Sequence, residues 1–216
     1  MIADTHVHTR LSKDAPQESE NTILSVLAEA GKKGLQYIAE TEHCDIITGK
    51  SCYNVDFPAY EASFVAAEHS QMAAGRSQTR LLFGIELAHA HTHKAEAAAI
   101  LAAHSFDFVL GSLHMPRDGV DTWEAAYQDA HDDKALFAAF ESYVGELYEI
   151  ASSCDFDSLA HCTYPLRYFA YNGRMSALCE KPSAFVPLYD AVFRKLIERG
   201  KALEINTSMV EERGVM

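Results

Sequence analysis

The sequence predicts an α/β fold in which parallel strands are covered by helices and close into a barrel. Strand and helix patterns alternate along the 216 residues, and the strand segments are short, nearly continuous apolar runs, as expected for strands buried on both faces. Histidine or glutamate stands at the carboxyl end of each of the first five strands. A barrel gathers residues from every strand end into one ring, whereas an open sheet concentrates its site at a switch point, so five contributing strands favour the barrel.

The first half of the chain supplies three strands and two helices. The first helix is predicted between a cap at Asn21 or Thr22 and a stop at Gly31 to Gly34, because its apolar residues recur at helical spacing. Pro58 can start the second helix, whose apolar stripe runs to Met72 and which ends at Gly75. The predicted strands of this half cover residues 1–8, 35–39 and 80–87.

The second half continues the alternation of helix and strand. Its most regular segment is residues 134–153, where apolar residues recur at helical spacing. Further helices are predicted at 95–103 and 184–199, and strands at 106–114, 156–161 and 202–206.

The first strand ends in Asp4-Thr5-His6-Val7-His8, which predicts a metal site. Residues i and i+2 of a strand point to the same side, so His6 and His8 can converge on one ion. Further ligand-type residues stand at later strand ends: His43, Glu86, His114 and His161. Histidine mixed with carboxylate and without thiolate suits Zn, Mn or Fe, and a shared glutamate commonly bridges two ions.

These segments together resemble the PHP (polymerase and histidinol phosphatase) superfamily of metal hydrolases. The resemblance rests on Asp4-Thr5-His6-Val7-His8-Thr9, Glu42-His43, Gly84-Ile85-Glu86, Gly111-Ser112-Leu113-His114 and Leu159-Ala160-His161. Tyr164-Pro165-Leu166-Arg167-Tyr168 and the segment 201–208 further resemble the histidinol-phosphatase branch. The resemblance implies one domain over residues 1–216, a distorted (β/α)7 TIM-like barrel, and two or three divalent metal ions.

The resemblance also implies a ligand set for each ion. His6, His8 and Glu86 are expected to hold the first ion, and Glu86, His114 and His161 the second. His43 and Asp14 are expected to hold a third. The family pattern ends with a seventh strand bearing Asp-x-His, whereas this sequence stops at Met216 after its sixth predicted strand. We therefore expect the last strand and helix to be lacking and the chain to be C-terminally incomplete.

The activity implied by the resemblance is hydrolysis of a phosphate monoester by a metal-activated water that attacks phosphorus. The branch makes L-histidinol phosphate the leading substrate, which places the enzyme in histidine biosynthesis. Arg167 is the best candidate for gripping the phosphate, because a guanidinium can contact two oxygens. Arg10 is a weaker second candidate, and His91 resembles a pocket position of the branch.

Two alternatives remain open at this stage. The same scaffold can act on nucleotides or another phosphate ester, and the missing Asp-x-His is compatible with a metal-binding regulatory domain without turnover. Within the chain, His89-Ala90-His91-Thr92-His93 also permits an independent metal site, although a loop position after the third strand disfavours it.

Composition limits the partners. The formal net charge of −13 argues against nucleic acid and anionic membranes. The chain begins without a leader pattern and has no apolar run of about 18 residues, so a cytoplasmic protein is predicted. The five cysteines include no Cys-x-x-Cys pair, which predicts reduced, buried thiols. The sequence leaves the oligomeric state open.

Overall fold

The computed structural model describes residues 2–12, 15, 19–47, 55–75, 79–117, 133–166 and 182–207. It divides into two compact units, Met1–Leu110 and Gly111–Met216. The prediction of a single domain stays a prediction.

The first unit is built on parallel strands. Their order is β1-β2-β4-β5, with β3 paired to β4, and the ladders β1–β2, β2–β4 and β3–β4 are parallel. The strands are β1 (Ala3–Val7), β2 (Tyr37–Glu40), β3 (His43–Asp45), β4 (Arg80–Ala88) and β5 (Phe108–Ser112), the last of which crosses the division between the units. The alternation of strand and helix predicted from the sequence is present.

Strand β3 continues the ladder that β2 begins. Tyr37 pairs with Arg80 and His43 pairs with Glu86, so both strands meet β4 at the same offset along the chain. Between the end of β2 and the start of β3, the carbonyl of Glu42 also accepts from the amide of Glu86 at 3.0 Å. The sequence predicted only one strand here, because the polar Glu40-Thr41-Glu42-His43 lacks the apolar pattern of a strand. The extra strand places His43 directly beside Glu86.

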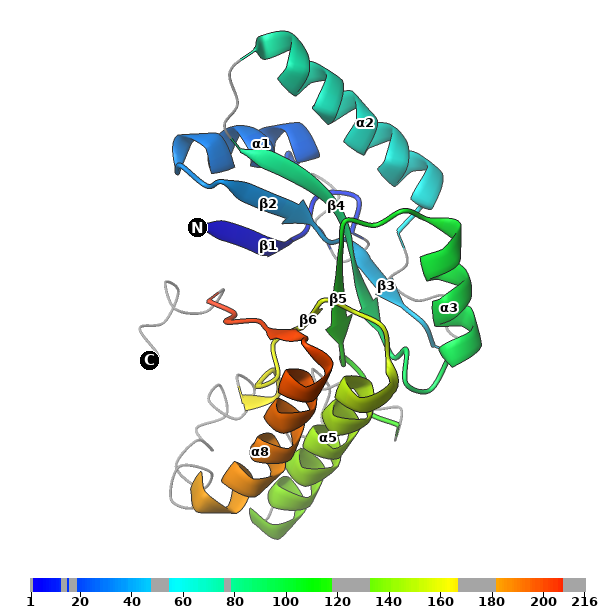
Figure 1. Ribbon diagram of the computed structural model, residues 1–216, viewed down its shortest axis with the longest axis vertical. Coiled ribbons are helices and arrows are strands. Elements are labelled where there is room, and N and C mark those ends of the chain that lie inside the picture. Colours follow the sequence, from blue (N-terminus) through cyan, green and yellow to red (C-terminus); the bar gives the residue numbers. More distant parts are fainter. Residues whose placement is uncertain are drawn as a thin grey trace. The chain divides into compact units, whose positions relative to one another are not determined.

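Helices α1 (Ile23–Lys32) and α2 (Phe57–Ala74) lie on the same side of β2 and β4 (Figure 1). Thr22 caps α1 as predicted, since its side chain accepts from the amide of Ser25 while the Ser25 hydroxyl accepts from the amide of Thr22. On α2 the Tyr60 and Phe64 rings pack against Phe83 of β4, at centroid distances of 4.7 and 5.0 Å. These contacts pack α2 against β4.

The prediction that Met72 belongs to the buried stripe of α2 is wrong. Tyr60, Phe64 and Ala67 are buried, but Met72 is 73% exposed. Helical spacing continues the stripe to Gln71 instead, which donates to the carbonyl of Thr79 at 2.6 Å. Met72 stands about 100° further round the helix and therefore faces away from the sheet.

The second unit contains two long helices and two short strands. Helices α5 (Asp133–Ser153) and α8 (Pro182–Arg199) lie side by side (Figure 1), and the Phe140 ring packs edge-on against Phe185 at 4.7 Å. Strand β6 (Ser158–Leu159) pairs in parallel with β7 (Ala202–Leu203). The amide of Ala160 donates to the carbonyl of Gly111, at the end of β5. Helix α3 (Lys94–Ala103) belongs to the first unit.

The late strands are shorter than the sequence predicted. Apolar patterns at 106–114, 156–161 and 202–206 correspond to β5, β6 and β7, of which the last two have two residues each. Leu113 and Ala160 continue the apolar patterns of β5 and β6 because a residue can be buried without belonging to a strand, whereas Ile205, past β7, is 87% exposed. His114 and His161 consequently stand just after their strands rather than in them.

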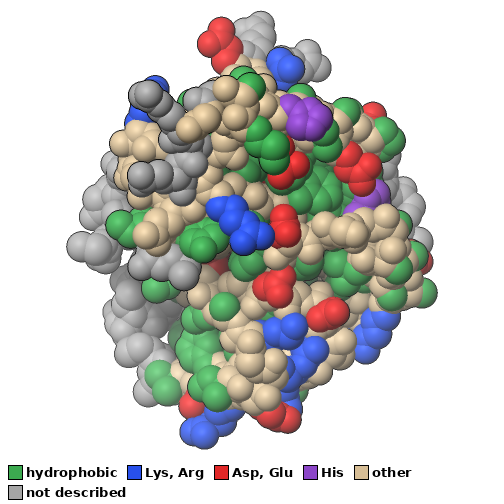
Figure 2. All heavy atoms as spheres, turned by 45° about the horizontal axis from the view of Figure 1, so that its top comes forward, with side chains coloured by type: hydrophobic (Ala, Val, Ile, Leu, Met, Phe, Trp, Pro, Cys, Tyr) green, Lys and Arg blue, Asp and Glu red, His purple; other side chains and the backbone are tan. Residues whose placement is uncertain are grey.

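The surface is mixed in charge. Lys and Arg side chains are interspersed among Asp and Glu on the face that Figure 2 shows. Among the helices that the structure describes, none is both long and apolar enough to cross a membrane.

Candidate metal centre

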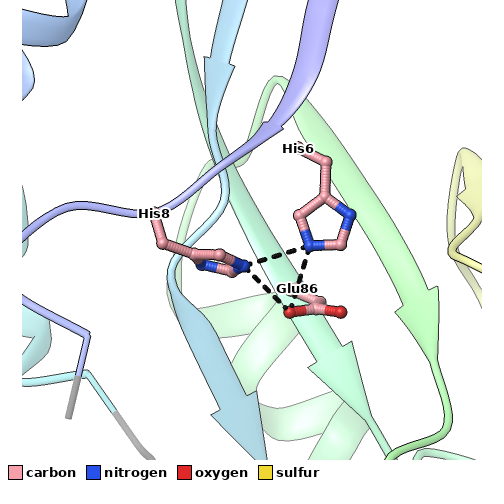
Figure 3. Close-up of side chains that lie close together, drawn as sticks. All are labelled: His6, His8 and Glu86. Atoms are coloured by element: carbon pink, nitrogen blue, oxygen red, sulfur yellow. Dashed lines mark hydrogen bonds and ion pairs between the residues drawn. The ribbon is translucent and has the colours of Figure 1, made fainter. Parts of the chain in front are cut away.

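His6, His8 and Glu86 converge on one point in the first unit (Figure 3). The Nε2 atoms of His6 and His8 are 3.1 Å apart, and they lie 3.3 and 3.4 Å from Oε2 of Glu86. Strand β1 supplies His6, the residue after its end supplies His8, and β4 supplies Glu86. The alternation predicted for the first strand therefore brings the two imidazoles to the same side.

The spacing of these three atoms fits a metal ion. Zinc binds histidine nitrogen and carboxylate oxygen at about 2.0–2.2 Å in a tetrahedral arrangement, which separates any two ligand atoms by about 3.3 Å. The three measured separations, 3.1, 3.3 and 3.4 Å, match the edges of such a tetrahedron. The Glu86 side chain is fully buried and His6 is nearly so, whereas 27% of the His8 side chain is exposed. The site is thus shielded but reachable from solvent.

His43 lies against the same carboxylate. Its Nδ1 is 2.8 Å from Oε2 of Glu86, and its ring stacks on that of His8 at a centroid distance of 4.1 Å. The direct pairing of His43 with Glu86 between β3 and β4 fixes this approach. One carboxylate oxygen therefore faces three histidine rings, which suits the bridging role predicted for Glu86. The third ion predicted for His43 and Asp14 stays a prediction, because Asp14 lies outside the described residues.

A buried hydrogen-bond network lies behind His8. The carboxylate of Glu42 accepts from the amide of Thr9 at 2.9 Å and from the hydroxyl groups of Thr9 and Ser12. The Ser12 hydroxyl is also 3.4 Å from Nδ1 of His8. Burial raises the pKa of Glu42, and the hydrogen bonds from Ser12 and Thr9 oppose that rise. Sequence reasoning assigned no role to Thr9, Ser12 or Glu42.

Glu40 is a second buried carboxyl, at the end of β2. Burial, reinforced by the neighbouring charges of Glu42 and Asp4, raises its pKa to about 9. Both of its side-chain oxygens are buried without a hydrogen-bond partner among the residues that the structure describes. Glu40 is therefore a neutral acid at pH 7 rather than a carboxylate.

The second unit brings together the two other predicted ligands. The rings of His114 and His161 are 5.3 Å apart, and the Tyr164 ring lies 5.8 and 4.9 Å from them. The amide of His161 donates to the carboxylate of Glu204, which follows β7. The prediction that His114 and His161 share an ion with Glu86 stays a prediction.

The remaining predicted site residues differ in what the structure shows of them. Arg10 is exposed, and its amide donates to the carbonyl of Asn21 at 2.8 Å. His91 is buried in the turn after β4, close to His89, whose φ of 65° is rare for a residue other than glycine. Arg167 lies outside the described residues. The roles predicted for Arg10, His91 and Arg167 stay predictions.

The chain matches a known protein family and is similar in sequence to two named relatives. Residues 4–208 match the PHP domain family. The chain is 27% identical to the probable histidinol-phosphatase of Clostridium acetobutylicum, an alignment that covers all of this chain and 76% of the relative. It is 23% identical to the histidinol-phosphatase of Lactococcus lactis, over 97% of this chain and 72% of that protein.

Two solved structures resemble the fold. The crystal structure of histidinol phosphate phosphatase from Lactococcus lactis, complexed with zinc, L-histidinol and phosphate, gives a TM-score of 0.71 at 22% identity and covers 95% of this chain and 73% of that one. The putative histidinol phosphatase from Listeria monocytogenes gives 0.77 at 12% identity, over 97% and 84% of the two chains. This likeness confirms the predicted fold class. The prediction that a last strand and helix are lacking stays a prediction.

Proposed function

The chain belongs to the PHP domain family, and from that premise we propose that it is a metal-dependent phosphatase whose substrate is L-histidinol phosphate. The observation that carries the proposal is the convergence of His6, His8 and Glu86, with ligand atoms within 3.4 Å of one another. It occurs in a chain aligned over its whole length with a relative named as a probable histidinol-phosphatase. The expected location, the cytoplasm, is that of a biosynthetic enzyme.

The chain's own residues have separable tasks in this reaction. His6, His8 and Glu86 would hold one divalent ion, and His43 lies close enough to Glu86 to assist at the same carboxylate. Bound Zn, Mn or Fe ions supply a Lewis acid for the phosphoryl oxygens and a water of lowered pKa. The Glu86 side chain is fully buried, and electrostatic interactions are stronger in such a shielded environment than in water.

A cationic side chain can hold the substrate's phosphate in addition to the metal ions. Arg167 is proposed for this task, with Arg10 as the second candidate and His91 as a residue of the substrate pocket. The net charge of −13 disfavours a phosphate ester at the surface in general, so local positive charge from metal ions and such cations would favour its binding at the site.

The proposal is tested with a panel of phosphomonoesters. The purified protein, loaded separately with Zn, Mn or Fe, should release phosphate from L-histidinol phosphate faster than from nucleotides or sugar phosphates. Chelation should abolish the activity, and the metal should restore it. Equal turnover of nucleotides would favour a broader phosphoesterase, and bound metal without any turnover would favour a regulatory domain.

Arg167→Ala should raise KM and lower kcat while leaving metal content unchanged, because the guanidinium would hold phosphate in both the ground state and the transition state. Arg167→Lys should recover little, since a point charge cannot reproduce a two-pronged contact. Arg194→Ala is the matched control, because Arg194 is an exposed residue of α8 paired with Asp190 at 2.6 Å. Unchanged kinetics for Arg167→Ala would remove Arg167 from the site.

A further inference from the structure

The loop after His8 is held by one buried carboxylate. Glu42 accepts from two groups of Thr9 and from the Ser12 hydroxyl, and all three residues are at least 96% buried. Within the loop, the amide of Leu11 donates to Oγ1 of Thr9 at 3.2 Å and the amide of Ser12 to the carbonyl of Thr9 at 3.1 Å. These bonds fix the position of the Ser12 hydroxyl relative to the strand that carries His8.

The position of the Ser12 hydroxyl decides what it can do for His8. A hydroxyl has one proton, and Ser12 donates it to Oε2 of Glu42. The Ser12 oxygen can then act toward Nδ1 of His8, 3.4 Å away, only as an acceptor. The proton of a neutral His8 imidazole is thereby favoured on Nδ1. Its Nε2, which lies 3.4 Å from Oε2 of Glu86 and 3.1 Å from Nε2 of His6, is then the nitrogen without a proton, the form that binds a metal ion.

We infer that Glu42 and Ser12 are positioning residues, which hold the ring of His8 in the orientation and tautomer that present Nε2 to a metal ion. The inference rests on the proposed function only in taking His8 as a ligand. A partner on the second nitrogen commonly orients metal-bound histidine and makes it a better ligand. Here the partner is a serine, and the carboxylate acts through it across 30 residues of sequence.

Zinc affinity, measured by competition with a chromophoric chelator, tests the inference without an activity assay. Ser12→Ala should weaken zinc binding by about 10- to 100-fold, the usual effect of removing such a partner. Ser70→Ala is the matched control. It removes the hydroxyl of an exposed serine of α2, which donates to the carbonyl of Ala66 at 2.9 Å, so zinc affinity should change little.

A double-mutant cycle separates a positioning role from general support of the loop. In a His8→Ala background, Ser12→Ala should cause no further loss of zinc affinity, because the ring on which Ser12 acts is absent. Thermal melts of all variants check that each one folds. An unchanged zinc affinity in Ser12→Ala, or an equal loss in both backgrounds, would overturn the inference.

The outcome is distinguishable from that of the proposed function. A wild-type protein that binds zinc but hydrolyses no phosphate ester would contradict the function and leave the zinc measurements valid. An active phosphatase in which Ser12→Ala binds zinc normally would contradict the inference alone.

Discussion

At the scale of single residues, Glu86 is the group on which the candidate centre depends most. One of its oxygens lies within 3.4 Å of nitrogen atoms from His6, His8 and His43. Glu86→Gln replaces a charged ligand by a neutral amide of the same shape. Phosphatase activity and zinc affinity should both fall by more than about 100-fold. This exceeds the loss usual for a residue that orients a ligand without binding the metal.

A second buried glutamate provides the control for Glu86→Gln. Glu146 of α5 accepts from the amide of Arg117 at 2.9 Å, and an amide oxygen can still accept that bond. Glu146→Gln should therefore keep both activity and zinc affinity. Residual activity of Glu86→Gln close to that of Glu146→Gln would exclude Glu86 as a shared ligand.

The buried Glu40 predicts an unusual pH dependence of stability. Its pKa is raised from 4.5 to about 9 by burial and by nearby carboxylates, so between these values the folded chain retains a proton that the unfolded chain releases. The free energy of unfolding falls as pH rises through this window, by at most about 1.4 kcal/mol per pH unit.

Glu40→Gln should remove this dependence, because an amide does not titrate. In urea unfolding at pH 6, 7 and 8, the free energy of unfolding of the variant should rise at each step relative to that of the wild type. A difference between the two proteins that stays constant with pH would show that Glu40 is already ionised in the folded state.

The sequence predicted some of these residues but not others, for a physical reason. His6 and His8 could be paired because a strand repeats every two residues, and Glu86 because it ends an apolar run. The roles of Ser12 and Glu42 depend on a contact between a loop and the residue before β3, 30 residues apart in the sequence. Hydroxyl side chains are common in loops, so no local pattern distinguishes the serine that meets a buried carboxylate.

At the scale of elements, Gly84 of β4 is the described glycine that leaves least room for a side chain. A Cβ at Gly84 would stand 2.7 Å from the carbonyl oxygen of Glu40 and 2.9 Å from that of Phe108, so backbone on both neighbouring strands blocks it. Gly84→Ala should destabilise the protein by about 1–3 kcal/mol, the usual range for overpacking. Chemical denaturation measures the change.

Gly145 provides the contrast for Gly84. It lies within α5, and a Cβ there would meet no atom within 4 Å. Gly145→Ala should stabilise the protein by about 0.5–1 kcal/mol, because alanine loses less conformational freedom in a helix. Similar effects of the two substitutions would contradict the close approach of strands at Gly84.

Helices were easier to predict than strands. The cap at Thr22 and the burial of Ile23, Leu27 and Ala30 follow from local rules. Strand β3 could not be predicted, because it consists of His43, Cys44 and Asp45 and owes its conformation to pairing with β4. A strand made of ligand-type polar residues lacks the apolar pattern by which strands are recognised.

At the scale of the whole molecule, metal binding should contribute to stability. The three ligand atoms come from β1, the residue that follows it, and β4, so an ion would link parts of the first unit that are far apart in sequence. A ligand that binds only the folded state at 100 times its Kd adds about 2.7 kcal/mol. Zinc should raise the melting temperature of the wild type and a chelator should lower it.

The matched variant for this measurement is His6→Ala, which removes a ligand whose side chain is only 9% exposed. Its melting temperature should respond much less to zinc than that of the wild type. An equal response in both proteins would place the stabilising ion elsewhere.

The fold class was predictable because it depends on the order of elements rather than on any one of them. Alternating helices and apolar strands already indicate parallel strands covered by helices. The number and length of the strands were not predictable to the same degree, since β6 and β7 have two residues each. Backbone pairing decides where a strand ends, and pairing is a property of two segments.

The shared offset of β2 and β3 against β4 restricts where the gene can gain or lose codons. A codon inserted between those for Glu40 and His43 would shift only the second ladder and turn His43 to the opposite face, away from Glu86. A codon inserted between those for Asp45 and Arg80 would shift both ladders equally and leave His43 opposite Glu86. Variation in length is therefore expected between Asp45 and Arg80 outside α2, where an insertion would rotate the face that packs against β4, and is excluded between Glu40 and His43.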